Sequence, residues 1–278
     1  MSLRIIEWAK LLSPLSKKIP YPSAMTIGFF DGVHRGHVEL ITRVVQQGMK
    51  STIVTFRENP KKFFEHHHYP GDIFSLEQKL SAFRILGIEQ VILIDFSESF
   101  SKMKGKEFIS ILIDRGNLRF LAIGSSFRCG HKLDIDAGII KDMNEAQGIP
   151  TEVVPSLRDD IGSISSSRIR SAIIQGDLPM AAALLGRNIE LELSSSNCNT
   201  FNNGAGTKEK GITFNMSGRL LPPPGQYRAL LHRAKLSGCL MEQIWEGDIV
   251  LGKGELTIPY LEYDGNVKVE FLSGPAAF

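Results

Sequence analysis

Two histidines, His34 and His37, stand three positions apart in the run Gly28–His37, which reads GFFDGVHRGH. Glycines let a backbone approach a ligand closely, and side chains at i and i+3 of a helix share one face. A helix that begins within this run would offer free N–H groups and a positive dipole end to an anion. Imidazole N–H groups can donate to phosphate oxygens whose charge grows in a transition state. The run therefore predicts a phosphate site rather than a turn that only connects two elements.

A second candidate anion site is the run Ser165-Ser166-Ser167, which Arg170 follows within one helical turn. Hydroxyls at a helix start and an arginine close behind them can bind a phosphate through charge-assisted hydrogen bonds. Taken alone, the run is better explained by a capping serine and a solvated arginine. Downstream of the histidine motif on the same domain, the anion-site interpretation is favoured.

Short apolar runs alternate with helix-like stretches over the first two thirds of the chain. The expected strands are Met25–Phe30, Thr52–Phe56, Val91–Ile94, Phe120–Ile123 and Thr151–Val154. The expected helices are Gly36–Gly48, Ser75–Leu86, Gly105–Arg115, Asp136–Gly148, Ser165–Gln175 and Asp177–Leu185. Apolar strands without alternation, separated by helices, indicate a doubly wound α/β domain with a parallel sheet. Its ligands should bind at the carboxyl ends of the strands, where the histidine motif begins.

The composition changes after Arg187, and we expect a domain boundary there, with domains at 1–187 and 188–278. Residues 194–211 are rich in Ser, Asn and Gly, which predicts a linker. The expected strands beyond it are Ile212–Met216, Tyr227–Leu231, Ile249–Leu251, Glu255–Ile258 and Val267–Leu272. Short strands set off by Pro and Gly predict a small antiparallel barrel-like β domain.

Charge and cysteine content limit the classes of partner. The formal net charge is +2, from 32 basic and 30 acidic residues, which gives no electrostatic support for a nucleic-acid or membrane partner. The scattered cysteines Cys129, Cys198 and Cys239 disfavour disulfides and a zinc site, and they fit a cytoplasmic protein. The run His66–His68 is better explained by a solvated loop than by a metal site. No signal peptide is expected, and the sequence does not indicate an oligomeric state.

The motifs together resemble the bacterial FAD synthetases, which are usually bifunctional riboflavin kinase/FMN adenylyltransferase proteins. The resemblance covers roughly residues 20–190 and rests on five stretches in family order. These are Gly28–His37, Thr55–Pro60, Gly124–Gly130, Ile164–Arg170 and Ala183–Arg187. The wider class with an H-x-G-H motif also contains adenylyltransferases that act on pantetheine phosphate or nicotinate nucleotides. Only the D-G-V-H context and the Gly124 element favour a flavin.

The resemblance implies that AMP passes from ATP to FMN, giving FAD and pyrophosphate, with Mg²⁺ held mostly by the substrate. The catalytic residues that it implies are His34, His37 and Arg170. The ATP-binding residues that it implies are Gly28, Phe29, Phe30, Asp31, Gly32, Gly36, Gly124, Ser126, Ser165, Ser166 and Ser167. The flavin-binding residues that it implies are Asn59, Phe63, Phe127 and Arg128.

Three departures from the family pattern bear on activity. Ser126 stands where the family usually has Asp, and Cys129 stands where it usually has an aromatic residue. These changes keep open a protein that binds nucleotide or flavin without catalysis. Residues 188–220 also lack the G-F-P-T-A-N segment of the family's kinase domain. We therefore expect a degenerate kinase-like domain without riboflavin kinase activity.

Overall fold

The computed structural model describes residues 3–64, 69–194, 198–202, 210–216, 218–234, 241–259 and 267–272. The run His66–His68, for which the sequence predicts a solvated loop, lies outside the described residues. Internal contacts divide the chain into two compact units. The first consists of Met1–Tyr69 and Leu76–Ile164, and the second of Pro70–Ser75 and Ser165–Phe278.

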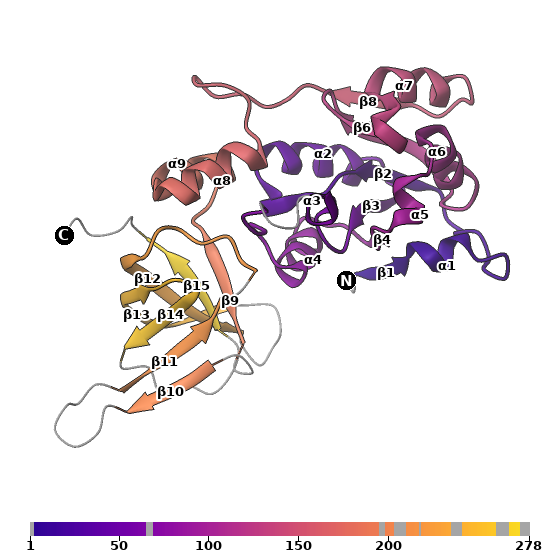
Figure 1. The fold of residues 1–278 in the computed structure, drawn as a ribbon. Helices are drawn as coiled ribbons and strands as arrows, with labels where there is room; N and C mark the ends of the chain where they lie inside the picture. The colour runs from indigo at the N-terminus through magenta and orange to yellow at the C-terminus, as the bar shows by residue number, and fades with distance from the viewer. Residues whose placement is uncertain are drawn as a thin grey trace. The chain divides into compact units, whose positions relative to one another are not determined.

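The first unit is built on a six-stranded parallel sheet with the order β1-β4-β3-β2-β5-β8 (Figure 1). Its strands are β1 (Arg4–Glu7), β2 (Ser23–Ile27), β3 (Lys50–Phe56), β4 (Gln90–Ile94), β5 (Leu118–Gly124) and β8 (Thr151–Val154). Every residue of β2 and β4 is buried. Burial on both faces of the sheet explains why these strands lack polar alternation.

Helices follow the strands of this sheet and cover both of its faces. They are α1 (Trp8–Leu12), α2 (Arg35–Val45), α3 (Pro60–Phe64), α4 (Leu76–Ile85), α5 (Glu98–Ser101), α6 (Gly105–Asp114) and α7 (Ala137–Glu145). Three-residue 3₁₀ turns, η1 (Asp31–Val33) and η2 (His131–Leu133), and a small ribbon of β6 (Arg128–Cys129) and β7 (Ile135–Asp136) complete the unit. Side chains of α1, α6 and α7 form one core layer with Met25, Ile27 and their neighbours on the sheet. Helix α2 packs on β2, β3 and β5.

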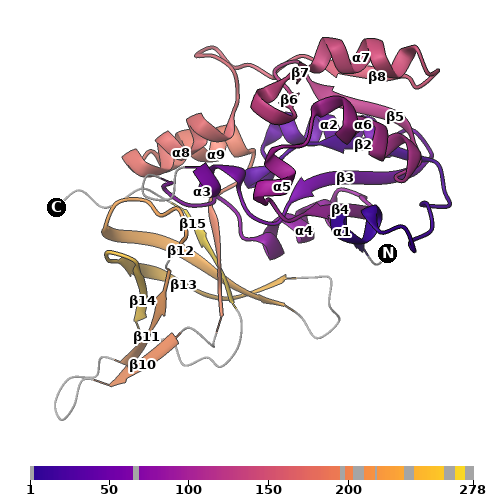
Figure 2. The same ribbon diagram turned by 45° about the vertical axis from the view of Figure 1, so that its right-hand side comes forward.

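The strand order places a topological switch point between β2 and β5. From β2 the chain continues to β3 and β4 on one side, whereas from β5 it continues to β8 on the other. Strands β2 and β5 are direct neighbours in parallel register, with Thr26 opposite Ala122, and Figure 2 shows them side by side in the sheet. Doubly wound sheets bind ligands beyond the carboxyl ends of the strands at such a point.

In its described residues, the second unit contains two helices and a seven-stranded antiparallel sheet with the order β10-β11-β14-β13-β12-β15-β9. The helices are α8 (Ser166–Gln175) and α9 (Leu178–Leu185), each closed by a glycine in the left-handed conformation. The strands are β9 (Glu190–Leu193), β10 (Cys198–Asn202), β11 (Lys210–Asn215), β12 (Gly225–Ala234), β13 (Met241–Leu251), β14 (Glu255–Pro259) and β15 (Val267–Phe271). The predicted fold class, a doubly wound α/β domain and an antiparallel β domain, is confirmed.

The loop or linker predicted over 194–211 is wrong at Cys198–Asn202 and at its last two residues, which lie in strands. Strand β10 lies within it and pairs antiparallel with β11, from Cys198 opposite Phe214 to Asn202 opposite Lys210. Backbone hydrogen bonds with a neighbouring strand override the weak strand propensity of Ser, Asn and Gly. Strand β13 is also longer than predicted, because its first part pairs with β12.

The two compact units do not follow the division predicted after Arg187. Helices α8 and α9 belong to the second unit, and so does the segment Pro70–Ser75 from between α3 and α4. The segment belongs there because its backbone pairs with Arg219 and Leu220, which lie between β11 and β12 in the strand-bearing part of the second unit, from β9 to β15, called the β unit below. The Leu220 N–H donates to the Asp72 carbonyl at 3.2 Å, and Asp72 forms a parallel bridge with Arg219.

Candidate active site

The histidine motif follows β2 through a turn with unusual backbone angles. Phe30 has φ 57°, Gly32 has φ 73° and Val33 has φ 40°. Left-handed backbone is uncommon for residues other than glycine, and a β-branched residue there is an outlier. Such strained positions persist where surrounding contacts hold them, and they cluster at functional sites. The turn closes as η1, and α2 then begins at Arg35 with His34 as its N-cap residue.

The two histidines lie in direct contact at the start of α2. Their imidazole rings stack with centroids 3.6 Å apart and 19° between the ring planes. The His37 backbone N–H donates to the His34 carbonyl at 2.7 Å, and the Phe30 ring meets the His37 ring at 5.0 Å. A methyl group at Gly36 would approach the His34 ring to about 3.3 Å, so glycine leaves room for this ring. The structure thus brings His34, His37, Phe30 and Gly36 together.

The first turn of α2 adds backbone donors beside the histidines. The N–H groups at the start of a helix have no intrahelical partner, and they suit an anion together with the dipole. His34 is buried, with 6% of its surface exposed, and Asp31 is buried as well. The turn therefore combines backbone and imidazole donors in a shielded place, where hydrogen bonds to phosphate are strengthened.

Two side chains to which the sequence patterns gave no role hold the residue before this turn. The Phe29 carbonyl accepts from Thr55 Oγ1 at 3.1 Å and from Lys79 Nζ at 3.3 Å. Lys79 also donates to the Phe56 carbonyl at 2.8 Å, and its Nζ lies 4.2 Å from the centre of the Phe29 ring. The sequence feature that could have indicated Lys79 is its position four residues before Phe83 in a predicted helix, because this spacing puts both side chains on one face.

The Gly124 element lies at the end of β5, beside the end of β2. The space around Gly124 is open, and the Ser125 N–H donates to the Val154 carbonyl at 2.9 Å. Ser126 is exposed, whereas the Phe127 ring is partly buried against the apolar core. The parallel sheet therefore brings Gly28 and Gly124 to the same edge, as the prediction of a nucleotide site requires.

Cys129 and Arg128 have different surroundings within this element. Burial raises the pKa of the Cys129 thiol to about 12, and the nearby Asp134 carboxylate adds to the shift. The thiol is therefore protonated at neutral pH and is a poor nucleophile. Arg128 is exposed, with its Nη2 3.9 Å from Asp136 Oδ2.

The predicted flavin residues Asn59 and Phe63 lie after β3. The buried Asn59 donates from Nδ2 to the Tyr69 hydroxyl at 2.7 Å and accepts the Lys61 N–H at 3.0 Å, so it organises the start of α3. Phe63 is 39% exposed. It belongs to an aromatic cluster with ring centroids 5.3–5.9 Å apart, which contains Trp8, Phe56, Phe63, Phe64, Phe96, Phe100 and Phe108.

The serine run and Arg170 belong to the second unit. Ser165 caps α8 by accepting the Arg168 N–H at 3.3 Å on its hydroxyl. Arg170 is 9% exposed, and its Nε donates to the Gly71 carbonyl at 3.4 Å. Arg170 is therefore not a solvated arginine, which was the simpler interpretation of this run. A meeting of Arg170, Ser166 and Ser167 with the histidines stays a prediction.

Comparison with known proteins identifies the family. A family model described as FAD synthetase matches residues 16–168, more than half of the chain. The chain belongs to the FAD synthetase family. It is 33% identical over 178 residues to a protein of Buchnera aphidicola subsp. Schizaphis graminum named bifunctional riboflavin kinase/FMN adenylyltransferase, covering 62% of this chain and 57% of that protein. A protein of the same name from Escherichia coli K12 is 29% identical over 167 residues, covering 58% and 53%. The chain thus spans about half the length of the curated relatives it matches.

A solved structure shares the fold over nearly the whole chain. It is the crystal structure of a macrolide-efflux protein from Streptococcus pneumoniae, with a TM-score of 0.75 and 22% identity, covering 98% of this chain and 91% of that one. This likeness concerns the fold alone. Within the FAD synthetase match lie both histidines and the Gly124 element, whereas Arg170 lies just beyond its end.

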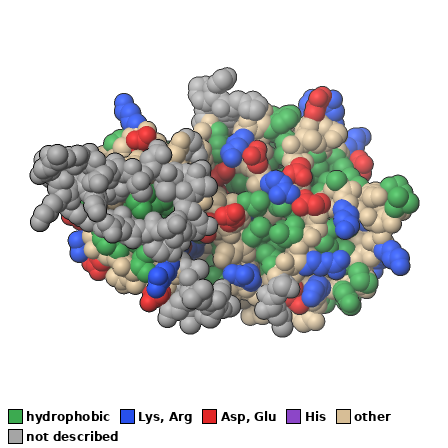
Figure 3. Space-filling view, turned by 90° about the horizontal axis from the view of Figure 1, so that it is seen from below, with side chains coloured by type: hydrophobic (Ala, Val, Ile, Leu, Met, Phe, Trp, Pro, Cys, Tyr) green, Lys and Arg blue, Asp and Glu red, His purple; other side chains and the backbone are tan. Residues whose placement is uncertain are grey.

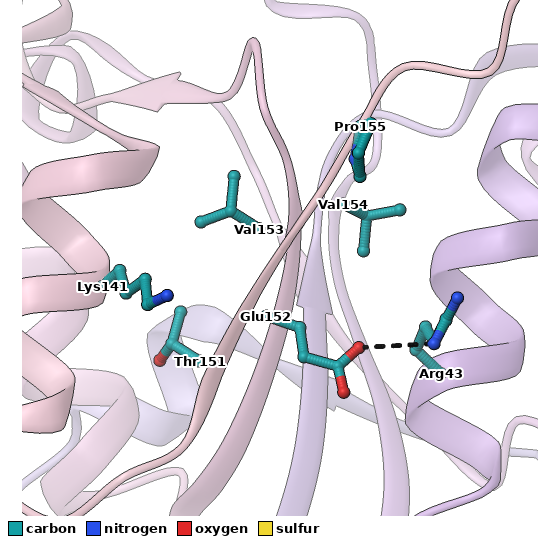
Figure 4. A pocket seen from close by; sticks show the side chains of 7 residues that line it. All are labelled: Arg43, Lys141, Thr151, Glu152, Val153, Val154 and Pro155. Carbon is teal, nitrogen blue, oxygen red and sulfur yellow. Dashed lines mark ion pairs between the residues drawn. The ribbon is translucent and has the colours of Figure 1, made fainter.

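Among the described residues of this FAD synthetase family member, a second surface feature is a weaker candidate site. A recess on β8 is lined by Lys141 of α7 and Arg43 of α2, with Arg43 paired to Glu152 at 3.9 Å (Figure 4). It contains none of the family motif residues. On the face in Figure 3, basic and acidic side chains are interspersed and no histidine is visible among the coloured residues.

Two kinds of feature are missing from the described residues. In these parts of the chain, no three His, Cys, Asp or Glu side chains gather closely enough to hold a metal ion. No helix within them has the length and apolar character needed to cross a membrane.

Proposed function

We propose that this protein is an FMN adenylyltransferase, which transfers AMP from ATP to FMN and releases pyrophosphate. The observation that carries the proposal is the stacked pair of His34 and His37 at the start of α2, on the sheet edge next to the switch point. This pair lies inside the stretch that matches the FAD synthetase family. The curated relatives are named as FMN adenylyltransferases, and we propose the same activity for this chain.

The reaction needs positioning and charge stabilisation rather than a protein nucleophile. A phosphate oxygen of FMN attacks the α-phosphorus of ATP, the new P–O bond forms, and the bond to the pyrophosphate oxygen breaks. ATP enters as its magnesium complex, with the ion held mostly by phosphate oxygens. His34, His37 and the first N–H groups of α2 would donate to the phosphates as negative charge moves toward the leaving pyrophosphate. A preorganised donor of this kind contributes on the order of 3–4 kcal/mol.

The remaining predicted residues have complementary roles. Gly124 and Ser126 would face the nucleotide, because the end of β5 adjoins the end of β2. Arg170 and the serines at the start of α8 would hold the pyrophosphate side. The exposed part of the aromatic cluster, at Phe63, offers a ring face that suits an isoalloxazine. Asn59 would act by holding α3 through its bonds to Lys61 and Tyr69.

Riboflavin kinase activity is expected to be absent, because residues 188–220 lack the kinase segment of the family. Where side chains of the β unit are described, its buried residues are mostly apolar, for example Phe214, Leu231 and Ile258. We expect the protein to act in the cytoplasm on small molecules.

One experiment tests these statements. The pure protein is incubated with ATP, Mg²⁺ and either FMN or riboflavin, and the flavins are separated by chromatography. FAD from FMN, with no FMN from riboflavin, is the expected result. FMN formed from riboflavin would show that the β unit is a kinase. Nucleotide or flavin binding without any product would instead support a binding protein, which the replacement of the family Asp by Ser126 favours.

A further inference from the structure

Lys79 is a buried lysine beneath the turn that carries the histidines. Only 3% of its surface is exposed, although burying an ammonium group is costly unless it is well bonded. Its Nζ donates to two backbone carbonyls, Phe56 at the end of β3 and Phe29 after β2. It also lies 4.2 Å from the centre of the Phe29 ring, within cation–π range. One side chain of α4 therefore ties together two strand ends at the edge that bears the candidate site.

Helix α4 contacts the turn a second time through Phe83. Its ring meets the Phe30 ring at 5.7 Å, nearly perpendicular, and Phe30 in turn contacts the His37 ring at 5.0 Å. Lys79 and Phe83 are four residues apart and share a face of the helix. Lys79 holds the backbone just before Phe30, which has a left-handed backbone conformation, and Phe83 packs against the Phe30 side chain. This contact series leads from α4 to the imidazole of His37.

From these contacts we infer that Lys79 is a positioning residue for the adenylyl transfer, acting through Phe29 and Phe30 on His37. The inference rests on the proposed function. Thr55 Oγ1 donates to the same Phe29 carbonyl and supports the same backbone position from β3. Without Lys79, the strained turn loses a charge-assisted bond on the carbonyl that precedes it. The first turn of α2 is then free to shift relative to the ends of β3 and β5.

The test compares Lys79→Met with Lys50→Met. Lys79→Met keeps a long side chain but removes the charge and the donors. Lys50 forms an ion pair with Glu89 at 2.7 Å at the start of β3. Lys50→Met therefore removes a lysine at the amino ends of the strands, opposite to the carboxyl ends that bear the candidate site. We expect Lys79→Met to lower kcat/KM for FAD formation about 100-fold, as a misplacement of about 1 Å does. Lys50→Met should leave kcat/KM unchanged.

A double-mutant cycle separates positioning from a general loss of stability. In a His37→Ala background, Lys79→Met should cost little more, because residues that act as a unit are strongly non-additive. Full additivity of the two losses would overturn the inference. Thr55→Val serves as a second variant should Lys79→Met fail to fold, and it should show a smaller loss that also disappears in the His37→Ala background. An additive loss for Thr55→Val would likewise count against the inference.

The imidazole resonances of His34 and His37 in NMR spectra give a readout that needs no turnover. Lys79→Met should shift them, whereas Lys50→Met should not. If the wild-type protein makes no FAD from FMN, the proposed function is refuted. The imidazole resonances would still test whether Lys79 positions His37. Unmoved resonances in a folded Lys79→Met protein, with kcat/KM near the wild-type value where activity exists, would overturn the inference.

Discussion

The imidazole of His34 stacks on that of His37, with 3.6 Å between the ring centroids, and the two residues are joined by a backbone hydrogen bond as well. Gly36 leaves space beside the first ring, and Phe30 packs against the second. The two rings are therefore held as one unit on the first turn of α2. A substitution of either residue should change the environment of the other.

Replacing His37 by alanine should lower turnover at least about 100-fold, since a preorganised donor contributes on the order of 3–4 kcal/mol to a transition state. FAD formation measured by chromatography reports the loss. The unfolding midpoint, measured by circular dichroism, should stay close to that of the wild type. A variant with near-normal turnover would remove His37 from the mechanism.

Gly36→Ala should reduce turnover by roughly tenfold or more, because the new methyl group would press on the His34 ring and displace it. Stability should be kept or should rise, since alanine favours a helix over glycine by about 1 kcal/mol. Gly138→Ala is a matched control, because Gly138 is likewise the second residue of its helix, α7, and no ring lies near it. Equal loss of turnover in both variants would contradict this reasoning.

Phe63→Ala should raise the KM for FMN by between about two- and tenfold, which corresponds to the typical value of an aromatic stacking pair. The KM for ATP should not change. Steady-state kinetics with each substrate varied in turn measures both constants. Leu15→Ala, at a highly exposed apolar residue, is the control. An equal rise of both KM values would argue against a flavin contact.

Cys129 should make stability depend on pH in the alkaline range. Its pKa is raised from 9.0 to about 12 in the folded protein, so the folded state holds a proton that the unfolded state loses. Its stabilising contribution is thus complete below pH 9 and is lost as the pH rises from 9 toward 12. Denaturant titrations of a variant with Cys198→Ser and Cys239→Ser should show this decline.

Adding Cys129→Ser to that variant should remove the part of the decline that the thiol causes. Iodoacetamide should also label Cys129 much more slowly in the folded than in the unfolded protein at pH 9. Labelling at equal rates would show that the thiol is not protected.

The sequence was sufficient to predict the parallel sheet and the histidine motif, because both depend on local patterns. Apolar runs such as Val91–Ile94 form the middle of buried strands, and the glycines and histidines of the motif mark the strand-to-helix turn that carries His34 and His37. The helix that starts at Ser165 was predicted for the same reason; the Ser165 hydroxyl accepts the Arg168 N–H, which is the capping role that was ranked below an ATP contact.

Contacts between distant segments could not be predicted in this way. Lys79 reaches carbonyls 23 and 50 residues away, and no spacing rule connects these positions. The edge strand β1 and strand β10 also went unpredicted. Each is a strand because a partner pairs with it, β4 for β1 and β11 for β10, and their own residues do not require that conformation.

The segment Pro70–Ser75 has a consequence for how such a protein can change over time. It separates two parts of the first unit in sequence, yet the β unit supplies the Leu220 donor for its Asp72 carbonyl. A deletion of the whole C-terminal portion would therefore remove Arg219 and Leu220, the backbone partners of a loop inside the N-terminal portion. Substitution of exposed side chains in the second unit carries no such penalty. Selection for the first unit alone would therefore preserve the β scaffold long after its own chemistry had ceased to matter.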